Sequence, residues 1–258
     1  MIKAVFFDVD GTLLSFETHE IPASTLNSLK ILREKGIKTF ISTGRHLHEL
    51  DGVRAVYEFD GYVMLNGQLC LDSSGKELRK LIFSEEDVMG AVSEAKKNEY
   101  PIYFTHGQGE FINMINDDIL NICKKLKLEI PAIENPEKAL GLDIYQLSAC
   151  LTKEQEQNLM GSMKSSEMVT WYPGYADIIP KDGGKHEGMR KVGEHYGFAP
   201  EEAMAFGDGG NDISMLKAAG IGVAMGNASE KVKLAADYVT DSVDNDGIEK
   251  ALKHFGVI

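Results

Sequence analysis

The sequence predicts an α/β protein in which a parallel, Rossmann-like sheet is interrupted by an inserted α+β domain. Short apolar runs alternate with longer helical patterns at both ends of the 258-residue chain, whereas paired strands follow single helices in the middle. A composition with 43% hydrophobic and 26% charged residues fits a folded globular chain of one large or two moderate domains. We therefore expect a discontinuous core domain at residues 1–83 and 181–258, with the inserted domain at 84–180.

Apolar runs bounded by turn residues mark the elements of the first core segment. Leu26, Leu29 and Leu32 recur along one side of a predicted helix, which ends at Gly36. The run 72–76 has the composition of a hairpin turn. The expected elements are strands at 4–7, 37–42 and 61–65, a helix at 25–35, and hairpin strands at 68–71 and 78–83.

The middle and last segments follow different patterns. Two strands follow one helix in the middle, which indicates an α+β domain of plausible size. Its expected helices are 87–97, 117–127, 136–140 and 153–163, and its extended runs are 102–105, 111–115, 143–151, 168–171 and 175–179. The first pattern then returns, with helices at 185–196, 213–219 and 229–236 and strands at 203–206, 221–224 and 238–239.

Charge and apolar content exclude several classes of partner. With 40 acidic and 27 basic side chains, the net charge of −13 disfavours binding to a nucleic-acid backbone. Apolar runs fall far short of the ~20 residues that cross a bilayer, and no secretory signal pattern is recognised. The 3 widely spaced cysteines fit reduced thiols. We expect a cytoplasmic monomer or weak homodimer that binds neither nucleic acid nor membrane.

Two carboxylates follow the first predicted strand. In the run Phe7-Asp8-Val9-Asp10-Gly11, side-chain alternation directs Asp8 and Asp10 to the same side. The alternative is a solvated turn, which an isolated motif of this length does not exclude. The apolar strand before it favours a functional site, because ligands of open α/β sheets bind beyond the carboxyl ends of the strands.

Two further loops carry polar groups after buried strands. Thr43, Gly44 and Arg45 offer a hydroxyl, an amide and a guanidinium to phosphate oxygens, although Ser and Thr at such positions are also common helix caps. In Gly207-Asp208-Gly209-Gly210-Asn211-Asp212, Asp208 and Asp212 are oxygen ligands of the kind that Mg²⁺ prefers. The alternative there is a capped turn before a helix.

Lys185 stands where a helix is expected to begin. A cation at a helix N-terminus opposes the helix macrodipole, so an anionic partner is the natural reason for it. Lys181 is a less specific competitor for the same role.

The four segments Asp8-Val9-Asp10-Gly11-Thr12, Ser42-Thr43-Gly44-Arg45, Lys185 and Gly207–Asp212, in this order, resemble the motifs of the haloacid dehalogenase (HAD) phosphohydrolase superfamily. The chain is similar to the Cof-type branch, which carries a large α+β (C2B-like) cap between the second and third motifs, and especially to bacterial hexose-phosphate phosphatases. The similarity extends over essentially the whole chain and includes the pair Asn66-Gly67.

The resemblance implies residue roles. Asp8 would be the nucleophile and Asp10 the general acid and base, while Thr43, the Gly44 amide, Lys185 and Asn211 would hold phosphoryl oxygens, with Arg45 near the phosphate or the cap. Mg²⁺ would be bound by Asp8, Asp208 and the backbone carbonyl of Asp10, with Asp212 as a further ligand or just behind the ligands. The implied reaction is hydrolysis of small phosphorylated metabolites, sugar phosphates first.

Two other functions stay open from the sequence. A phosphomannomutase-like enzyme would pass the phosphoryl group to a second sugar, and a receiver-like domain would hold phosphate on an aspartate as a signal. Asp10 favours turnover over signalling, because it supplies an acid and base beside the nucleophile. The cap is expected to close over the substrate. Five of its polar side chains could contact sugar hydroxyls: His106, Gln108, Glu110, Tyr175 and Asp177. The alternative is that these side chains belong to an ordinary solvated hairpin.

Overall fold

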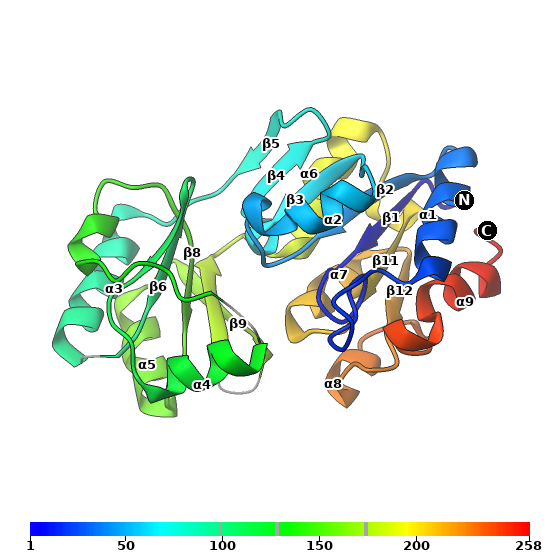
Figure 1. The fold of residues 1–258 in the computed structure, drawn as a ribbon. Helices are drawn as coiled ribbons and strands as arrows, with labels where there is room; N and C mark the ends of the chain where they lie inside the picture. Colours follow the sequence, from blue (N-terminus) through cyan, green and yellow to red (C-terminus); the bar gives the residue numbers. More distant parts are fainter. Residues whose placement is uncertain (99, 127–128, 173–174) are drawn as a thin grey trace. The chain divides into compact units, whose positions relative to one another are not determined.

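The computed structural model describes residues 1–98, 100–126, 129–172 and 175–258 (Figure 1). Its contacts divide the chain into two compact units, of which the first joins Met1–Lys80 to Gly183–Ile258 and the second spans Leu81–Asp182. We call them the core unit and the inserted unit. Their boundaries lie a few residues from those expected from the sequence.

The core unit contains, within the described residues, an eight-stranded sheet with the order β13-β12-β11-β1-β2-β3-β4-β5. Its strands are β1 (Ala4–Phe7), β2 (Lys38–Ser42), β3 (Gly61–Met64), β4 (Leu69–Asp72), β5 (Glu77–Lys80), β11 (Ala203–Gly207), β12 (Ile221–Ala224) and β13 (Tyr238–Val239). Neighbouring strands from β13 to β3 pair in parallel, and β4 and β5 extend the sheet in antiparallel. The predicted α/β class is confirmed.

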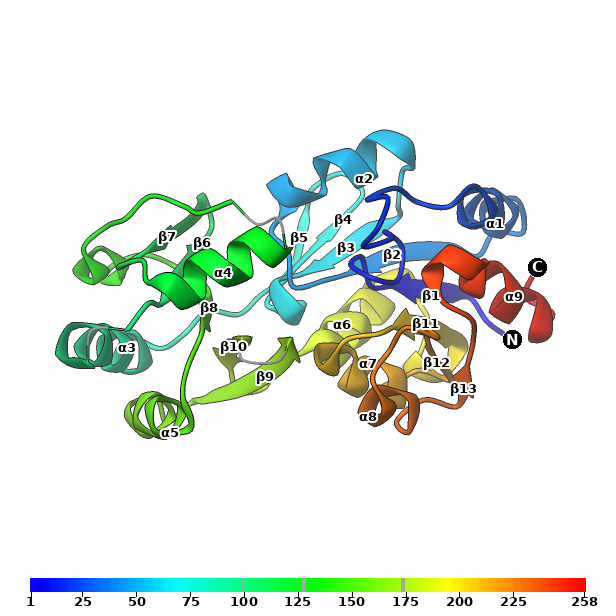
Figure 2. The same cartoon turned by 60° about the horizontal axis from the view of Figure 1, so that its bottom comes forward.

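Helices cover both faces of this sheet (Figure 2). They are α1 (Ala23–Glu34), α2 (Asp51–Val56), α6 (Lys185–Tyr196), α7 (Ile213–Ala218), α8 (Glu230–Lys233) and α9 (Gly247–His254). In Figure 2, α1, α2 and α9 lie on one face, and α6 and α7 lie on the other. Short 3-10 turns connect them at Leu47–Leu50, Leu65–Gly67, Pro200–Glu202, Gly210–Asp212 and Val243–Asn245.

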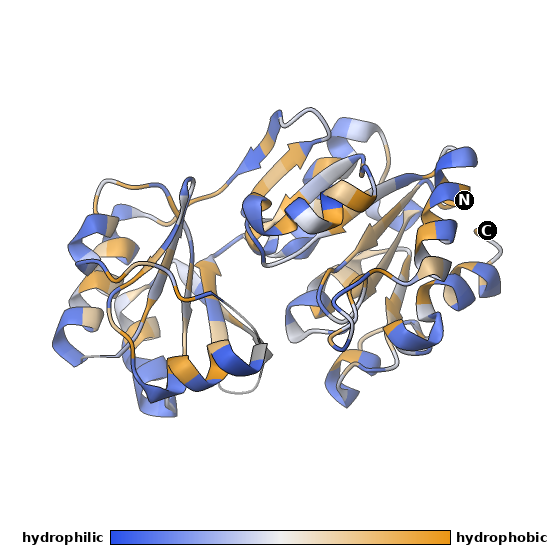
Figure 3. Ribbon diagram, viewed as in Figure 1, coloured by the Kyte–Doolittle hydropathy of each residue, from blue (hydrophilic) through white to orange (hydrophobic). Residues whose placement is uncertain are grey.

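The central strands are apolar because both of their faces are covered. All four side chains of β1 are fully buried, and the Phe6 and Phe40 rings of neighbouring strands stack with centroids 4.8 Å apart. Figure 3 shows these strands in the apolar colour and much of the helical surface in the polar one. The strand ends that carry the predicted site residues are therefore anchored in a rigid core.

The inserted unit is built on an antiparallel sheet with the order β7-β6-β8-β10-β9 among the residues described. Its strands are β6 (Tyr103–His106), β7 (Gly109–Ile112), β8 (Ile144–Ala149), β9 (Ser166–Tyr172) and β10 (Tyr175–Pro180), and its helices are α3 (Glu85–Asn98), α4 (Asp117–Leu126), α5 (Lys153–Ser162) and the 3-10 turn Pro136–Ala139. One cluster joins Phe104 and Leu147 of the sheet to α3 and α5, and another joins Tyr103 to Ile119 of α4. The predicted helix 117–127 ends on a residue outside the described part.

Among the helices of the described residues, none is both long and apolar enough to cross a bilayer.

Candidate active site

Three of the predicted segments meet at one edge of the core sheet. Asp8 directly follows β1, Thr43 follows β2, and Asp208 follows β11. Because β11, β1 and β2 are adjacent and parallel, their carboxyl ends lie side by side. This is the edge at which open α/β sheets bind ligands.

Lys185 joins two of the acidic side chains. Its Nζ donates to Asp8 Oδ1 at 2.6 Å and to Asp212 Oδ1 at 2.5 Å. The Lys185 side chain is 0% exposed, and Asp8 and Asp212 are also buried. Lys185, the first residue of α6, therefore contacts the residue after β1 although 177 positions separate the two in the sequence. The anionic partners expected for Lys185 are carboxylates of the protein itself.

Asp8, Asp208 and Asp212 form an acidic cluster in which one carboxylate oxygen from each lies within 4.8 Å of the others. Asp212 is committed to protein groups, because its Oδ2 accepts the backbone N–H groups of Asp208 at 3.0 Å and Gly209 at 2.9 Å while its Oδ1 accepts Lys185. Asp8 and Asp208 keep more acceptor capacity. The arrangement favours these two as ligands of a cation, with Asp212 behind them.

The electrostatics of the cluster favour a bound cation. Burial and then the Asp212 carboxylate raise the pKa of Asp8 well above its ordinary value, against the opposing effect of Lys185. Burial and Asp212 likewise raise the pKa of Asp208 to about 7. Burial disfavours the Lys185 ammonium, but Asp212 and Asp8 outweigh this and raise its pKa. One lysine therefore leaves the cluster short of positive charge.

Asp10 is held by Arg45. The guanidinium donates from Nε to Asp10 Oδ2 at 2.9 Å and from Nη2 to Asp10 Oδ1 at 2.5 Å, and its Nη1 donates to the Glu49 carbonyl at 3.0 Å. A two-point pair of this kind fixes the plane of the carboxylate. In this structure Arg45 orients Asp10. The place near the phosphate or the cap that the resemblance implies for Arg45 stays a prediction.

Thr43 and Asn211 lie in the loops around the acidic cluster. Thr43 is buried, and its Oγ1 accepts the Arg45 backbone N–H at 3.1 Å, so the hydroxyl shapes the loop after β2. Gly44, which lies between Thr43 and Arg45 in the sequence, is half-buried. Asn211 is also half-buried, and its Nδ2 donates to Asn66 Oδ1 at 2.9 Å.

Sequence reasoning missed three residues that hold the site. Thr12 Oγ1 donates to Asp208 Oδ1 at 2.9 Å, and Asn227 Nδ2 donates to the Gly11 carbonyl at 2.9 Å and to Asp208 Oδ2 at 3.2 Å. Asn66, the third, accepts from Asn211. Thr12 lies in the first motif and Asn66 in the pair Asn66-Gly67, whereas Asn227 lies in no segment that the sequence singled out. Gly11 has a φ of +80°, and a Cβ there would overlap the Asp208 carboxylate, so this loop packs directly on that side chain.

The polar residues expected to meet the substrate from the inserted unit differ in exposure. Gln108 and Glu110 are exposed, and His106 is half-buried. Tyr175 and Asp177 are buried, and Asp177 Oδ1 accepts from Ser148 Oγ at 2.7 Å within the sheet. Their role toward a substrate stays a prediction.

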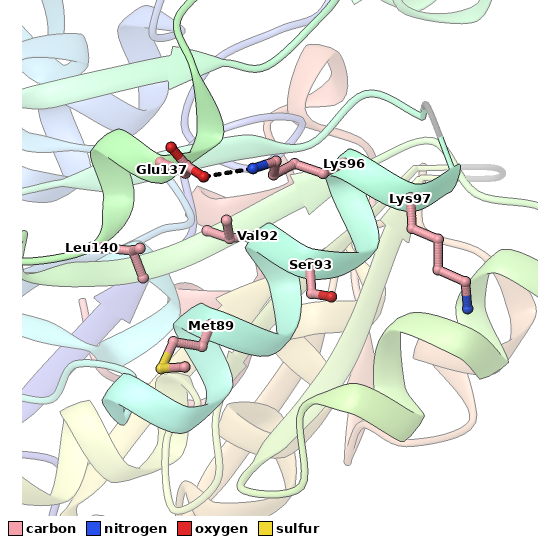
Figure 4. A pocket seen from close by; sticks show the side chains of 7 residues that line it. All are labelled: Met89, Val92, Ser93, Lys96, Lys97, Glu137 and Leu140. Carbon is pink, nitrogen blue, oxygen red and sulfur yellow. Dashed lines mark hydrogen bonds and ion pairs between the residues drawn. The ribbon is translucent and has the colours of Figure 1, made fainter.

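A pocket of about 420 Å³ also lies in the inserted unit, beside α3 (Figure 4). Its wall includes the Lys96–Glu137 ion pair and the apolar side chains of Met89 and Leu140. It contains none of the residues predicted for the site.

A family model described as haloacid dehalogenase-like hydrolase matches residues 5–252. The chain belongs to this hydrolase family. The resemblance inferred from the motifs is thereby confirmed, and the HAD fold agrees with the parallel core sheet and its inserted unit.

Several HAD proteins resemble the chain over nearly its full length. BT1666, a HAD phosphatase from Bacteroides thetaiotaomicron, is 40% identical with a TM-score of 0.93, covering 100% of this chain and 96% of its own. The subclass IIB sugar phosphatase BT4131 is 40% identical with a TM-score of 0.89, covering 99% and 100%. YcsE of Bacillus subtilis (strain 168), a 5-amino-6-(5-phospho-D-ribitylamino)uracil phosphatase, is 30% identical in an alignment of 272 positions that covers 98% of this chain and 96% of YcsE.

Proposed function

We propose that the protein is a Mg²⁺-dependent phosphatase of small phosphorylated metabolites, sugar phosphates and above all hexose phosphates, and that it acts through an aspartyl-phosphate on Asp8. One observation carries the proposal: Lys185 bridges Asp8 and Asp212 beside Asp208, at the carboxyl ends of β1 and β11. The similarity to BT4131, a sugar phosphatase, supports the substrate class.

In the first step Asp8 attacks phosphorus. A bond forms between an Asp8 carboxylate oxygen and phosphorus, and the bond between phosphorus and the ester oxygen breaks. The ester oxygen keeps the electron pair and takes a proton from the carboxyl group of Asp10, so the alcohol leaves neutral. Arg45 would supply the orientation that this proton transfer needs.

In the second step water cleaves the intermediate. Asp10, now a carboxylate, removes a proton from the water as its oxygen attacks phosphorus. The bond between phosphorus and Asp8 breaks, which releases inorganic phosphate and regenerates the Asp8 carboxylate. Asp10 therefore serves as the acid in the first displacement and as the base in the second, while Asp8 is the nucleophile and then the leaving group.

Positive and hydrogen-donating groups would stabilise the phosphoryl group during both steps. Lys185 supplies a buried ammonium, and the Thr43 hydroxyl, the Gly44 amide and the Asn211 amide stand on loops at the same strand ends. Phosphoryl transfer depends mainly on such positioning and charge neutralisation.

The acidic cluster fits Mg²⁺. Its donors are carboxylate oxygens, and burial together with the neighbouring Asp212 carboxylate raises the pKa of Asp8 and of Asp208. Asp8 and Asp208 would hold the ion with the Asp10 carbonyl. When bound, the ion neutralises charge on the phosphoryl group and keeps Asp8 ionised beside an anionic substrate.

Chelation of divalent cations should stop turnover. EDTA is expected to abolish phosphate release, and added Mg²⁺ to restore it, because the cluster lacks compensating charge without the ion. Independently of activity, Mg²⁺ should raise the melting temperature of the wild-type protein, since a ligand that binds only the folded state stabilises it.

The matched variant is Asp208→Asn, which removes one proposed ligand and keeps the side-chain shape. Its melting temperature should respond weakly to Mg²⁺. An equal thermal response in Asp208→Asn and wild type, or turnover that is indifferent to EDTA, would remove the ion from this cluster.

The substrate class is tested by phosphate release from a panel with Mg²⁺ present. The panel contains hexose, pentose and triose phosphates, nucleotides, phosphoglycolate and pyridoxal phosphate. We expect hexose phosphates to give the highest kcat/KM. A flat profile would contradict the hexose preference and indicate a generalist. Absence of phosphate release from every compound would overturn the phosphatase function and favour the receiver-like one. Net transfer of phosphate to a second sugar would overturn it in favour of the mutase.

A further inference from the structure

The turn between β3 and β4 has an unusual backbone. Leu65, Asn66 and Gly67 follow one another with φ values of +51°, +54° and +90°. The left-handed region is disfavoured for residues with a side chain, and for Leu more than for Asn. Such a conformation persists only where surrounding contacts stabilise it, so the segments that contact this turn indicate its role.

The loop that follows β2 is one of these contacts. The Asn66 backbone N–H donates to the Thr43 carbonyl at 2.9 Å, and the Leu65 N–H donates to the Arg45 carbonyl at 3.2 Å. Arg79 Nε in turn donates to the Gly67 carbonyl at 2.9 Å. The left-handed turn is thereby fastened to the segment proposed to bind phosphate.

The start of α6 is the second contact. A Cβ on Gly67 would overlap the carbonyl of Gly184, the residue before Lys185. The turn therefore lies directly against the backbone from which the Lys185 side chain departs, and only a glycine fits between them.

The third contact is made by the Asn66 side chain itself. Asn66 is 1% exposed, and its Oδ1 accepts from Asn211 Nδ2 at 2.9 Å, although 145 positions separate the two residues. The Asn211 amide nitrogen carries two hydrogens. The bond to Asn66 uses one of them and fixes the direction of the other.

We propose that Asn66 is a positioning residue, whose backbone and side-chain hydrogen bonds align Thr43 and Asn211 for one phosphoryl group. The proposal rests on the proposed phosphatase function and adds a residue that does not itself touch the substrate. Asparagine suits the position because it tolerates left-handed backbone and also supplies the amide oxygen, whereas glycine satisfies only the first requirement.

This difference supplies the test variants. Asn66→Gly keeps the backbone free to turn and removes the amide, and Asn66→Ala removes the same amide while disfavouring the turn. Both should lower kcat/KM for the best substrate about tenfold, the size of one lost hydrogen bond in the transition state. Asn66→Ala should also melt at a lower temperature than Asn66→Gly. A loss of kcat/KM in Asn66→Ala alone, in parallel with its lower melting temperature, would contradict the proposal.

A double-mutant cycle with Asn211→Ala identifies the route of the effect. If Asn66 acts through Asn211, Asn66→Gly should change kcat/KM little once Asn211 is already alanine. Multiplicative losses, or wild-type kcat/KM in Asn66→Gly, would overturn the proposal.

Binding of inorganic phosphate, measured by calorimetry with Mg²⁺ present, provides a second readout that needs no turnover. The affinity should fall in Asn66→Gly and in Asn211→Ala, with no further fall in the double variant. Wild-type affinity in Asn66→Gly would contradict the alignment role. If the wild-type protein binds phosphate but hydrolyses no ester, the proposed phosphatase function fails. The cycle of phosphate affinities would still test the positioning role of Asn66.

Discussion

Asp8→Asn is expected to lower kcat at least about 10⁴-fold, since an amide oxygen is a poor nucleophile and cannot form the proposed acyl phosphate. The fold should persist. Asp8 is a buried carboxylate whose charged form is disfavoured by burial and by Asp212, so its replacement by a neutral isostere removes a destabilising charge. We expect a melting temperature at or above that of the metal-free wild type.

A surface variant controls for the loss of an acidic side chain. Asp51 lies in the first turn of α2, with a side chain 74% exposed and paired to Arg54. Asp51→Asn should retain wild-type kcat and KM. If Asp8→Asn kept more than a few per cent of the wild-type rate, Asp8 would not be the nucleophile.

Lys185→Met should impair both stability and catalysis. It leaves Asp8 and Asp212 facing each other without the ammonium that now bridges them at 2.6 and 2.5 Å. Breaking a buried pair by removing one partner costs about 3 kcal/mol or more, and protonation of Asp8 limits that cost. Loss of the buried cation should also lower kcat/KM about 10³-fold.

Lys181 offers the matched control for Lys185→Met. It is four positions earlier, exposed, and donates to the Lys164 carbonyl. Lys181→Met should keep wild-type activity and change the free energy of unfolding by less than about 0.5 kcal/mol. Stability and activity of Lys185→Met equal to those of Lys181→Met would contradict the assigned role of Lys185.

Much of the site was accessible from the sequence because its residues follow apolar strands. Asp8, Thr43 and Asp208 each come directly after a buried run, and parallel strands bring their carboxyl ends to one edge. The position of Lys185 at a helix start indicated an anionic partner, and the structure supplies Asp8 and Asp212.

The pairing of Arg45 with Asp10 could not be predicted in the same way. Strand alternation applies only up to Phe7, where β1 ends, and the chain then turns at Gly11 with a φ of +80°. The direction of the Asp10 carboxylate depends on that turn and on the loop carrying Arg45, which periodicity does not describe.

The missed residues act across long separations in sequence. Thr12 reaches Asp208 over 196 positions, and Asn227 reaches Gly11 over 216. No local pattern marks such contacts. Asn66 belongs to the pair Asn66-Gly67 that the family resemblance includes, yet its left-handed backbone and its hydrogen bond to Asn211 arise only in the folded chain.

The helix predictions differ from the structure at α8, α2 and α9. The expected helix 229–236 contains a single turn, α8, and α2 was not expected because its six residues include Gly52 and leave one buried side chain. The C-terminal helix α9 was also missed, although Ile248, Ala251 and Leu252 show the spacing of an apolar helix face.

The proposed mechanism requires that Asp8 carries the phosphoryl group during turnover. The most direct measurement mixes wild-type protein, Mg²⁺ and the best substrate of the panel, quenches in acid within the first turnover, and locates phosphate on the digested protein by mass spectrometry. We predict one phosphoryl group on the peptide that contains Asp8, sensitive to hydroxylamine and absent from Asp8→Asn. Steady turnover by the wild type with no phosphopeptide at any of a range of quench times, or with phosphate on another residue, would contradict this mechanism.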